Sequence, residues 1–192
     1  MRNRVRSLCA LAAGIITCAL VTAEASNVIH MTLRDLVVRG DRIVRGTVVA
    51  ADEGTVSAGG GNIPIVTYRI RVDEALKGSV AGGDVIEVRM LATTKQASSG
   101  SLRRATVLRD LPQFAVGRNY LFVLTRPSRI GLSTTVGLGQ GLFELRGRPG
   151  QELAVNAANN LGLLSGVRGA PASPGPVAYA SLVKEIRTLV GR

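Results

Sequence analysis

The sequence offers few side chains that could carry acid–base or metal chemistry. Its one histidine is His30, and its two cysteines, Cys9 and Cys18, both lie near the N-terminus. Ser-His-Asp catalysis would need that histidine beside a serine on a strained turn, and the sequence has no G-x-S-x-G motif. A zinc site without cysteine would need carboxylates in unusual number. A lone histidine close to a terminus more often has no chemical role.

Two short patterns resemble catalytic or nucleotide-binding motifs. Residues 181–184 read S-x-x-K, the nucleophile pattern of penicillin-interacting enzymes, but the companion S-D-N and K-T-G elements are absent. The glycine run 137–141 resembles a nucleotide-binding loop, but a strand-like segment follows it instead of a helix whose N-terminus could hold a phosphate. We interpret this run as a glycine-rich bend between two strands.

Two acidic pairs, Asp52-Glu53 and Asp73-Glu74, lie in strand-like segments. Adjacent side chains on a strand point to opposite faces, so neither pair forms an acid–base couple by itself. The sequence therefore predicts no catalytic residue, no metal ligand and no cofactor. A hydrolase with an unrecognised site is the alternative, and a pocket that gathers several ionisable groups would reveal it.

The N-terminus has the pattern of an export signal. Three arginines at positions 2, 4 and 6 precede an apolar run, 8–21, that is shorter than the roughly 20 residues needed to span a bilayer. Small residues then flank Glu24, which is typical of cleavage after Ala25. We expect residues 1–25 to be a signal peptide and the protein to be secreted or periplasmic, with no stable membrane span after cleavage. A retained membrane anchor is the alternative.

Cleavage after Ala25 would remove both cysteines. The mature chain would then have no disulfide, no thiolate metal site and no cysteine nucleophile. Its single domain would depend on a hydrophobic core for stability. The full sequence has a formal net charge of +11, and such a basic balance favours anionic surroundings or partners.

Residues 41–78 predict one long β-hairpin. The second arm alternates, which is typical of a strand with one buried and one solvated face. The first arm, around 43–49, is rich in β-branched residues, and Gly59–Gly61 form the tip between the arms. The residues expected to be buried are Val66, Tyr68, Ile70 and Val72, and those expected on the other face are Thr67, Arg69, Arg71 and Asp73.

Further short strands follow at the spacing of hairpins. The segment 119–126 is nearly all apolar, which indicates a strand buried on both faces. With the hairpin, these strands predict a mainly β fold, a small antiparallel barrel or sandwich in a domain spanning 26–164. The other strands are expected at 84–91, 132–138, 141–146 and 152–155.

A helix is expected on either side of this domain. The segment 31–39 has helical spacing, with Thr32 as N-cap and Asp35 completing a weak capping box. Residues 165–176 have the Pro/Gly composition of a linker. The final segment, 177–192, carries an apolar stripe that predicts a helix docked on the barrel, with a partner-binding helix as the alternative.

The long polar segment 92–109 is the candidate binding loop. A rigid barrel that presents such a loop is a common arrangement for recognition. An acidic partner or a polyanion would be attracted by its basic residues, and ordinary solubilising charges are the alternative. The predicted binding residues are Lys95, Arg103, Arg104 and Arg109. Nucleic acid is disfavoured because single-strand binding uses exposed aromatic rings, whereas most of the six aromatic residues lie in apolar strand contexts.

The order of elements at 41–48, 67–78 and 119–124 resembles the netrin-like module, the domain of tissue inhibitors of metalloproteinases. With the glycine-rich stretch 137–143, it also looks like exported bacterial proteins of the same plan. This resemblance implies a five-stranded closed or partly open barrel of the oligonucleotide/oligosaccharide-binding (OB) type, with helices packed outside. Those inhibitors chelate the protease zinc through an N-terminal cysteine, whereas the expected mature N-terminus here is Ser26, so that mechanism does not carry over.

Taken together, these patterns predict an exported, non-enzymatic β-barrel protein that recognises a protein or an anionic surface polymer. An inhibitor or accessory partner of a secreted protease is one alternative, and a purely structural envelope protein is another. The sequence leaves the oligomeric state open.

Processing gives the first testable prediction. Mass spectrometry of the exported protein should find Ser26 at its N-terminus, because the small residues before it fit signal-peptidase cleavage. Intact Met1 on protein recovered outside the cytoplasm would contradict the signal-peptide assignment.

Overall fold

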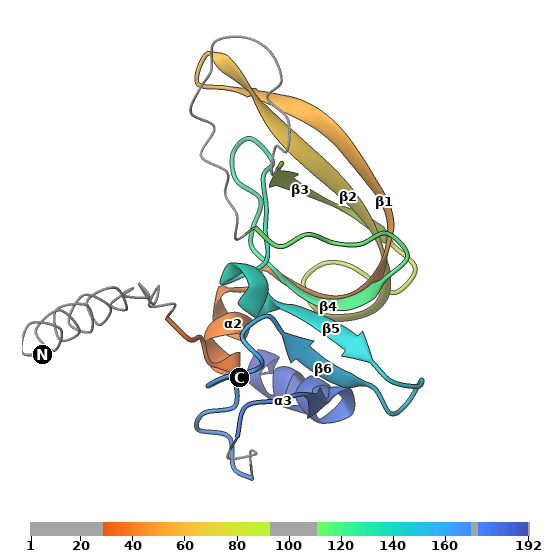
Figure 1. Cartoon of the computed structure of the whole chain (residues 1–192), viewed down its shortest axis with the longest axis vertical. Helices are drawn as coiled ribbons and strands as arrows, with labels where there is room; N and C mark the ends of the chain where they lie inside the picture. The colour runs from red at the N-terminus through yellow and green to blue at the C-terminus, as the bar shows by residue number, and fades with distance from the viewer. Residues whose placement is uncertain (1–28, 93–110, 170–172, 192) are drawn as a thin grey trace, which may run out of the picture.

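The structure is a computed structural model that describes residues 29–92, 111–169 and 173–191. The predicted signal peptide, 1–25, lies outside the described residues. The fold is mainly β, as the sequence predicts, with one short helix before the sheet and one after it (Figure 1). In chain order the elements are α2 (Leu33–Arg39), β1 (Arg42–Ala58), β2 (Gly61–Lys77), β3 (Val85–Leu91), β4 (Asn119–Leu124), the 3₁₀ helix η2 (Leu138–Gly141), β5 (Leu142–Arg146), β6 (Leu153–Asn156), β7 (Val177–Ala178) and α3 (Tyr179–Val190).

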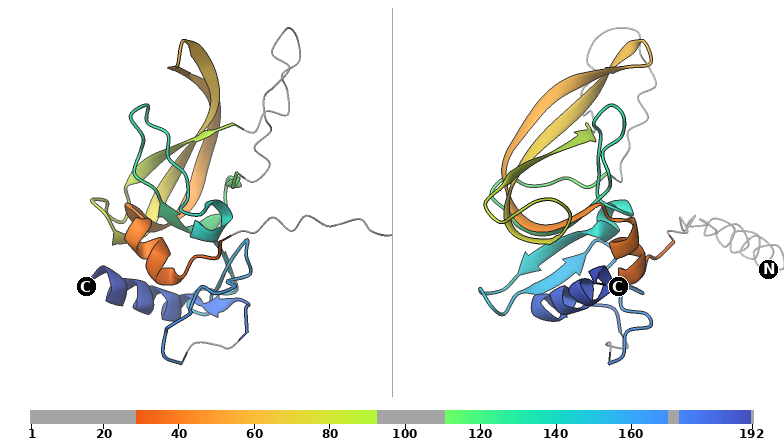
Figure 2. Two further views of the ribbon diagram at one scale, coloured as in Figure 1. Left: turned by 90° about the vertical axis from the view of Figure 1, so that its left-hand side faces the viewer. Right: turned by 180° about the vertical axis from the view of Figure 1, so that it is seen from behind.

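The described strands form one seven-stranded antiparallel sheet that is not closed into a barrel. Its order is β3-β2-β1-β4-β5-β6-β7. Figure 2 shows β1 and β2 curving away from the shorter strands and helices. Two isolated bridges join strands to the segment after β4: Arg89 pairs with Leu132 in parallel, and Leu124 pairs with Thr135 antiparallel. Residues 132–135 therefore lie between the ends of β3 and β4 and contact both strands.

The predicted hairpin is confirmed as β1 and β2. The predicted face of β2 is also confirmed, because Tyr68, Ile70 and Val72 are buried while Arg69 and Arg71 are exposed. The pairing of β1 with β2 shifts register at three places between residues 43 and 50. Such irregularities bend a strand and increase its twist, which fits the curvature of this hairpin.

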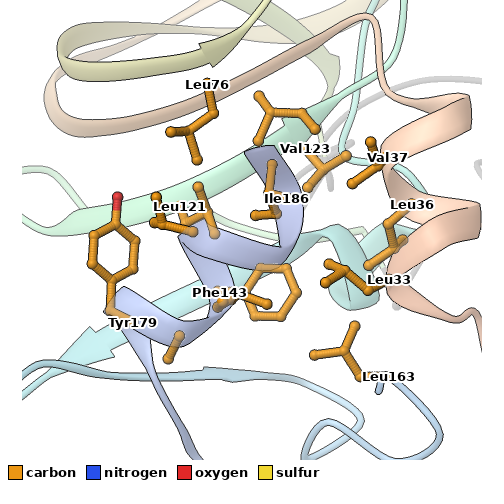
Figure 3. Packing of buried hydrophobic residues seen from close by; sticks show 14 of the residues in the cluster. Leu33, Leu36, Val37, Leu76, Leu121, Val123, Phe143, Leu163, Tyr179 and Ile186 are labelled. Atoms are coloured by element: carbon orange, nitrogen blue, oxygen red, sulfur yellow. The ribbon is translucent and has the colours of Figure 1, made fainter. Parts of the chain in front are cut away.

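Two hydrophobic cores lie on opposite faces of the sheet. The first, the helix core, packs α2 and α3 against β4, β5 and the adjacent strands (Figure 3). The second, the concave core, fills the inner face of β1, β2 and β3. Neighbouring residues of one strand enter different cores, since Ile43 belongs to the helix core and Val44 to the concave core.

The strand β4 separates the two cores, which confirms that it is buried on both faces. Leu121 and Val123 face the helix core, while Tyr120, Phe122 and Leu124 face the concave core. All six aromatic side chains are at most 7% exposed, as their apolar contexts predict. In the concave core, Phe114, Tyr68, Tyr120 and Phe122 form a ring cluster with centroid separations of 4.6–6.5 Å.

The helix α2 begins and ends as the sequence predicts. Thr32 and Asp35 form the capping box: the Asp35 N–H donates to Thr32 Oγ1 at 3.2 Å, and the Thr32 N–H donates to Asp35 Oδ2 at 3.0 Å. The hydrogen bond from the Thr32 hydroxyl lowers the pKa of Asp35. At the other end, Lys77 Nζ donates to the carbonyls of Val37 and Gly40, a favourable place for a cation near a helix C-terminus.

The C-terminal helix docks against the sheet, as predicted, with Leu182, Val183 and Ile186 buried. The helix begins at Tyr179, two residues later than the sequence suggests, because Val177–Ala178 pair with β6 as β7. Within the part of the chain that the structure describes, no helix has the length and apolar character needed to cross a bilayer.

The segment 132–138 is not the strand that its sequence suggests. It contributes the two isolated bridges and then turns into η2. Gly137 has a left-handed backbone with φ of 62°, and a Cβ on Gly141 would collide with the Val136 carbonyl oxygen. Glycines therefore permit a tight turn where the apolar pattern alone indicates a continuous strand.

The register of β2 gives the second prediction. Replacing Ile70 by Ala should lower the free energy of unfolding by roughly 2–5 kcal/mol, because the side chain is fully buried in the concave core. The adjacent Arg71→Ala should change it by only about 0.5 kcal/mol, the usual limit for a surface site. Denaturant unfolding measures both, and equal costs at the two positions would mean that this register is wrong.

Candidate interaction surface

A polar cluster joins the start of α3 to the sheet. Arg45 of β1 donates to Asn119 Oδ1 at 2.9 Å and to Glu152 Oε1 at 3.0 Å, and its guanidinium lies 5.0 Å from the Tyr179 ring centroid. The Tyr179 hydroxyl donates to Glu74 Oε2 at 2.7 Å. Burial and this hydrogen bond raise the pKa of Tyr179, and hydrogen bonds from its own backbone N–H and from Arg45 lower the pKa of Glu152.

This cluster attaches α3 to the sheet. Arg187, further along α3, also reaches Glu74, at 2.7 Å from Oε1, so both carboxylate oxygens of Glu74 bind this helix. The Tyr179 hydroxyl, whose pKa is raised chiefly by burial, serves as a hydrogen-bond donor within the protein. The charges in the cluster are therefore engaged with one another and hold the helix in place.

The outer face of β2 and β3 carries three arginines, Arg69, Arg71 and Arg89. Each lies within 3.7 Å of a carboxylate, on Asp52, Asp73 and Glu87 respectively. Their side chains are about half exposed, so the pairs contribute little to stability. Because a carboxylate accompanies every guanidinium, this face alternates in charge and is not a continuous basic patch.

The outer half of the β1–β2 hairpin, residues 49–64, is here called the distal ribbon. It projects beyond the other described strands and helices (Figures 1 and 2). None of its residues belongs to either core. Val49 is 42% exposed, and most of the other side chains along 50–62 are exposed as well. The distal ribbon is thus held by its own cross-strand pairing and has both faces largely open to solvent.

The predicted binding residues Lys95, Arg103, Arg104 and Arg109 lie outside the described residues. The structure does show where this loop leaves and rejoins the fold. The Ala92 N–H donates to the Pro64 carbonyl at 3.0 Å, at the base of the distal ribbon. Phe114, just after the loop, packs on Tyr68 in the concave core.

The remaining candidates from the sequence do not assemble into a site. His30, Ser181 and Lys184 are exposed. The glycine run leads directly into β5, as predicted, but it forms the 3₁₀ helix η2, and the segment directly before it is not a strand. Asp73 and Glu74 do not point to opposite faces as the sequence predicts, because β1 and β2 shift register between Arg45 and Gly46. Both side chains lie on the face away from the concave core, where Asp73 accepts from the Thr47 hydroxyl and Glu74 binds α3.

A cavity of about 300 Å³ lies among residues 160–167 and 173–177. It is lined by glycine, serine, proline, asparagine and aliphatic residues, and no titratable side chain is among them. Across the described ranges, no group of three or more histidine, cysteine or acidic side chains is arranged to hold a metal ion. The distal ribbon is therefore the stronger candidate for an interaction surface among the described residues. The residue pattern alone does not reveal it, because that pattern indicates a strand buried on one side.

Comparison with known proteins adds no assignment. No protein-family model matches this chain, and a search of curated proteins gives no significant match. The function proposed below is therefore inferred from the sequence and geometry of this chain.

Proposed function

We propose that this protein is an exported, non-catalytic binding module whose distal ribbon contacts a partner protein. The observation that carries the proposal is the position of residues 49–64 outside both cores. An isolated two-stranded hairpin is at best marginally stable in water. Exposed strand edges also invite unwanted pairing. A ribbon of this length adds little to the stability of the domain. Contact with another molecule would explain why the protein has such a ribbon.

The rest of the fold suits a rigid support for such a ribbon. The proximal parts of β1 and β2 contribute to both cores, and α3 is anchored to the sheet through Arg45, Glu74 and Tyr179. Recognition elements are commonly carried in this way on scaffolds that do not move. The partner would be a protein because the ribbon presents backbone edges and small side chains, whereas the arginines of the outer face are paired with carboxylates.

The finer architecture belongs to the same proposal. We infer a partly open barrel of the OB type, as in the netrin-like module. The bridges from Arg89 to Leu132 and from Leu124 to Thr135 support it, because they link β3 to β4 through 132–135. The concave core would then be the barrel interior. In this arrangement the distal ribbon is the extended connection between the first two barrel strands.

Photo-crosslinking in the producing cells tests this function. A photoreactive residue in place of Thr55, on the distal ribbon, should give a discrete protein adduct. The same residue in place of Thr188, an exposed threonine on α3, should give none above background. The two positions are matched in residue type and exposure and differ in their place on the molecule.

Adducts of equal yield at both positions would show contact without a specific surface and would contradict the proposal. The absence of any adduct from Thr55 in cells that export the protein would contradict it as well. Thermal unfolding of both variants checks that the substitutions leave the domain folded.

A further inference from the structure

One edge of the distal ribbon has no neighbouring strand in the described structure. β1 pairs with β4 over Arg42–Thr47. Val48 extends this pairing by one step, since its N–H donates to the Arg118 carbonyl and its carbonyl accepts from the Gly117 N–H. From 49 to 58, no described residue pairs with β1 on the side away from β2. This ten-residue stretch, 49–58, is here called the open edge.

The edge on the other side of the ribbon is protected. β2 pairs with β3 over Ile65–Arg71, and the Pro64 carbonyl accepts from the Ala92 N–H. Proline also removes a backbone donor, which is a common way to block a strand edge. The open edge has neither proline nor lysine, two common protective residues, and its only charged side chains are those of Asp52 and Glu53. The two edges therefore differ, and only the one on β1 presents a long run of backbone groups suited to strand pairing.

From the open edge we propose that the partner binds by strand addition, as an extended segment that pairs antiparallel with β1 and carries a basic side chain facing Glu53. This proposal rests on the proposed function and specifies its binding mode. Main-chain hydrogen bonds would supply affinity and the side chains facing the segment would supply selectivity, as in other cases of strand addition.

Charge favours a basic segment. Asp52 and Glu53 are the only charged residues between 49 and 64. Asp52 is already paired with Arg69 at 3.3 Å. Glu53 is opposite Val66, so its carboxylate lies on the other face of the ribbon from Asp52, beside an apolar neighbour. A lysine or arginine on the added strand could form an ion pair with the Glu53 carboxylate. The positive charges of the rest of the protein are screened beyond about 8 Å at physiological salt.

The same charge disfavours a second copy of this chain as the occupant. Two-fold antiparallel pairing of two open edges about their middle places Glu53 directly opposite or diagonal to Glu53 of the copy. Like charges facing one another across strands are destabilising. Self-pairing in the registers of greatest overlap is thus opposed by the residue that would attract a basic partner.

The test uses blocked ten-residue peptides of alternating threonine and valine, with either one central lysine or one central glutamate. Backbone amide shifts of the mature protein are followed by NMR during titration. The lysine peptide should perturb amides of 49–58 and bind roughly three- to tenfold more tightly than the glutamate peptide, the combined effect of a favourable and an unfavourable cross-strand pair. Glu53→Lys should reverse this preference. Glu185→Lys, a matched charge reversal on α3, should leave it unchanged.

Three results would overturn the proposal. The first is the absence of shifts at the open edge with either peptide at millimolar concentration. The second is equal binding by a lysine peptide whose alternate amides are N-methylated, because main-chain pairing would then not be used. The third is a wild-type dimer held through 49–58. If Thr55 cross-links to a partner while these peptides fail to pair, the proposed function stands and strand addition is rejected.

Discussion

The fold depends on β1, which contributes side chains to both hydrophobic cores within a few residues. Ile43 and Val44 point into opposite cores, and the strand must then bend before it continues into the distal ribbon. Gly46 makes this possible, because a Cβ at that position would lie 2.6 Å from the Arg71 carbonyl oxygen and 2.7 Å from Ile70 Cγ2. The close approach of β2 at Gly46 therefore requires a residue without a side chain.

The separate roles of the two halves of β1 follow from this arrangement. The proximal half is flanked by β2 on one side and β4 on the other, and its residues are buried or partly buried. Pairing with β4 ends at Thr47, and the concave core takes its last β1 residue at Val48. Beyond this point β2 is the only strand that pairs with β1 among the described residues. β1 is thus one continuous strand whose first half lies between two neighbouring strands and whose second half forms an edge of the described sheet.

Much of the local structure could be predicted because it follows from nearby residues. Alternation identified the buried face of β2, and Thr32 with Asp35 identified the start of α2. The exposed distal ribbon could not be predicted in the same way. Val49, Val56 and Ile63 have the β-branched character of buried strand residues, and only the limits of β4 and of the cores show that they lie outside.

Other features depend on residues distant in the sequence. The contact of Arg45 with Glu152 joins residues 107 positions apart, and the bond between Tyr179 and Glu74 joins residues 105 apart. No local pattern indicates such pairs. The segment 132–138 shows the opposite difficulty: its apolar residues suggest a strand, but the backbone turns at Gly137 and Gly141. As for the candidate site, the sequence drew attention to the basic loop, whereas the described structure draws attention to the hairpin beside it.

Native-state hydrogen exchange is the most direct test of the central claim that the distal ribbon lies outside the cooperative core. Amides of β4 and of β1 between 43 and 48 should exchange only through global unfolding, with the full denaturant dependence. Amides that join the two strands between 50 and 64 should exchange orders of magnitude faster, through local opening with a weak denaturant dependence. Equal opening free energies and equal denaturant dependence in the ribbon and in β4 would place the ribbon within the core unit and contradict this account.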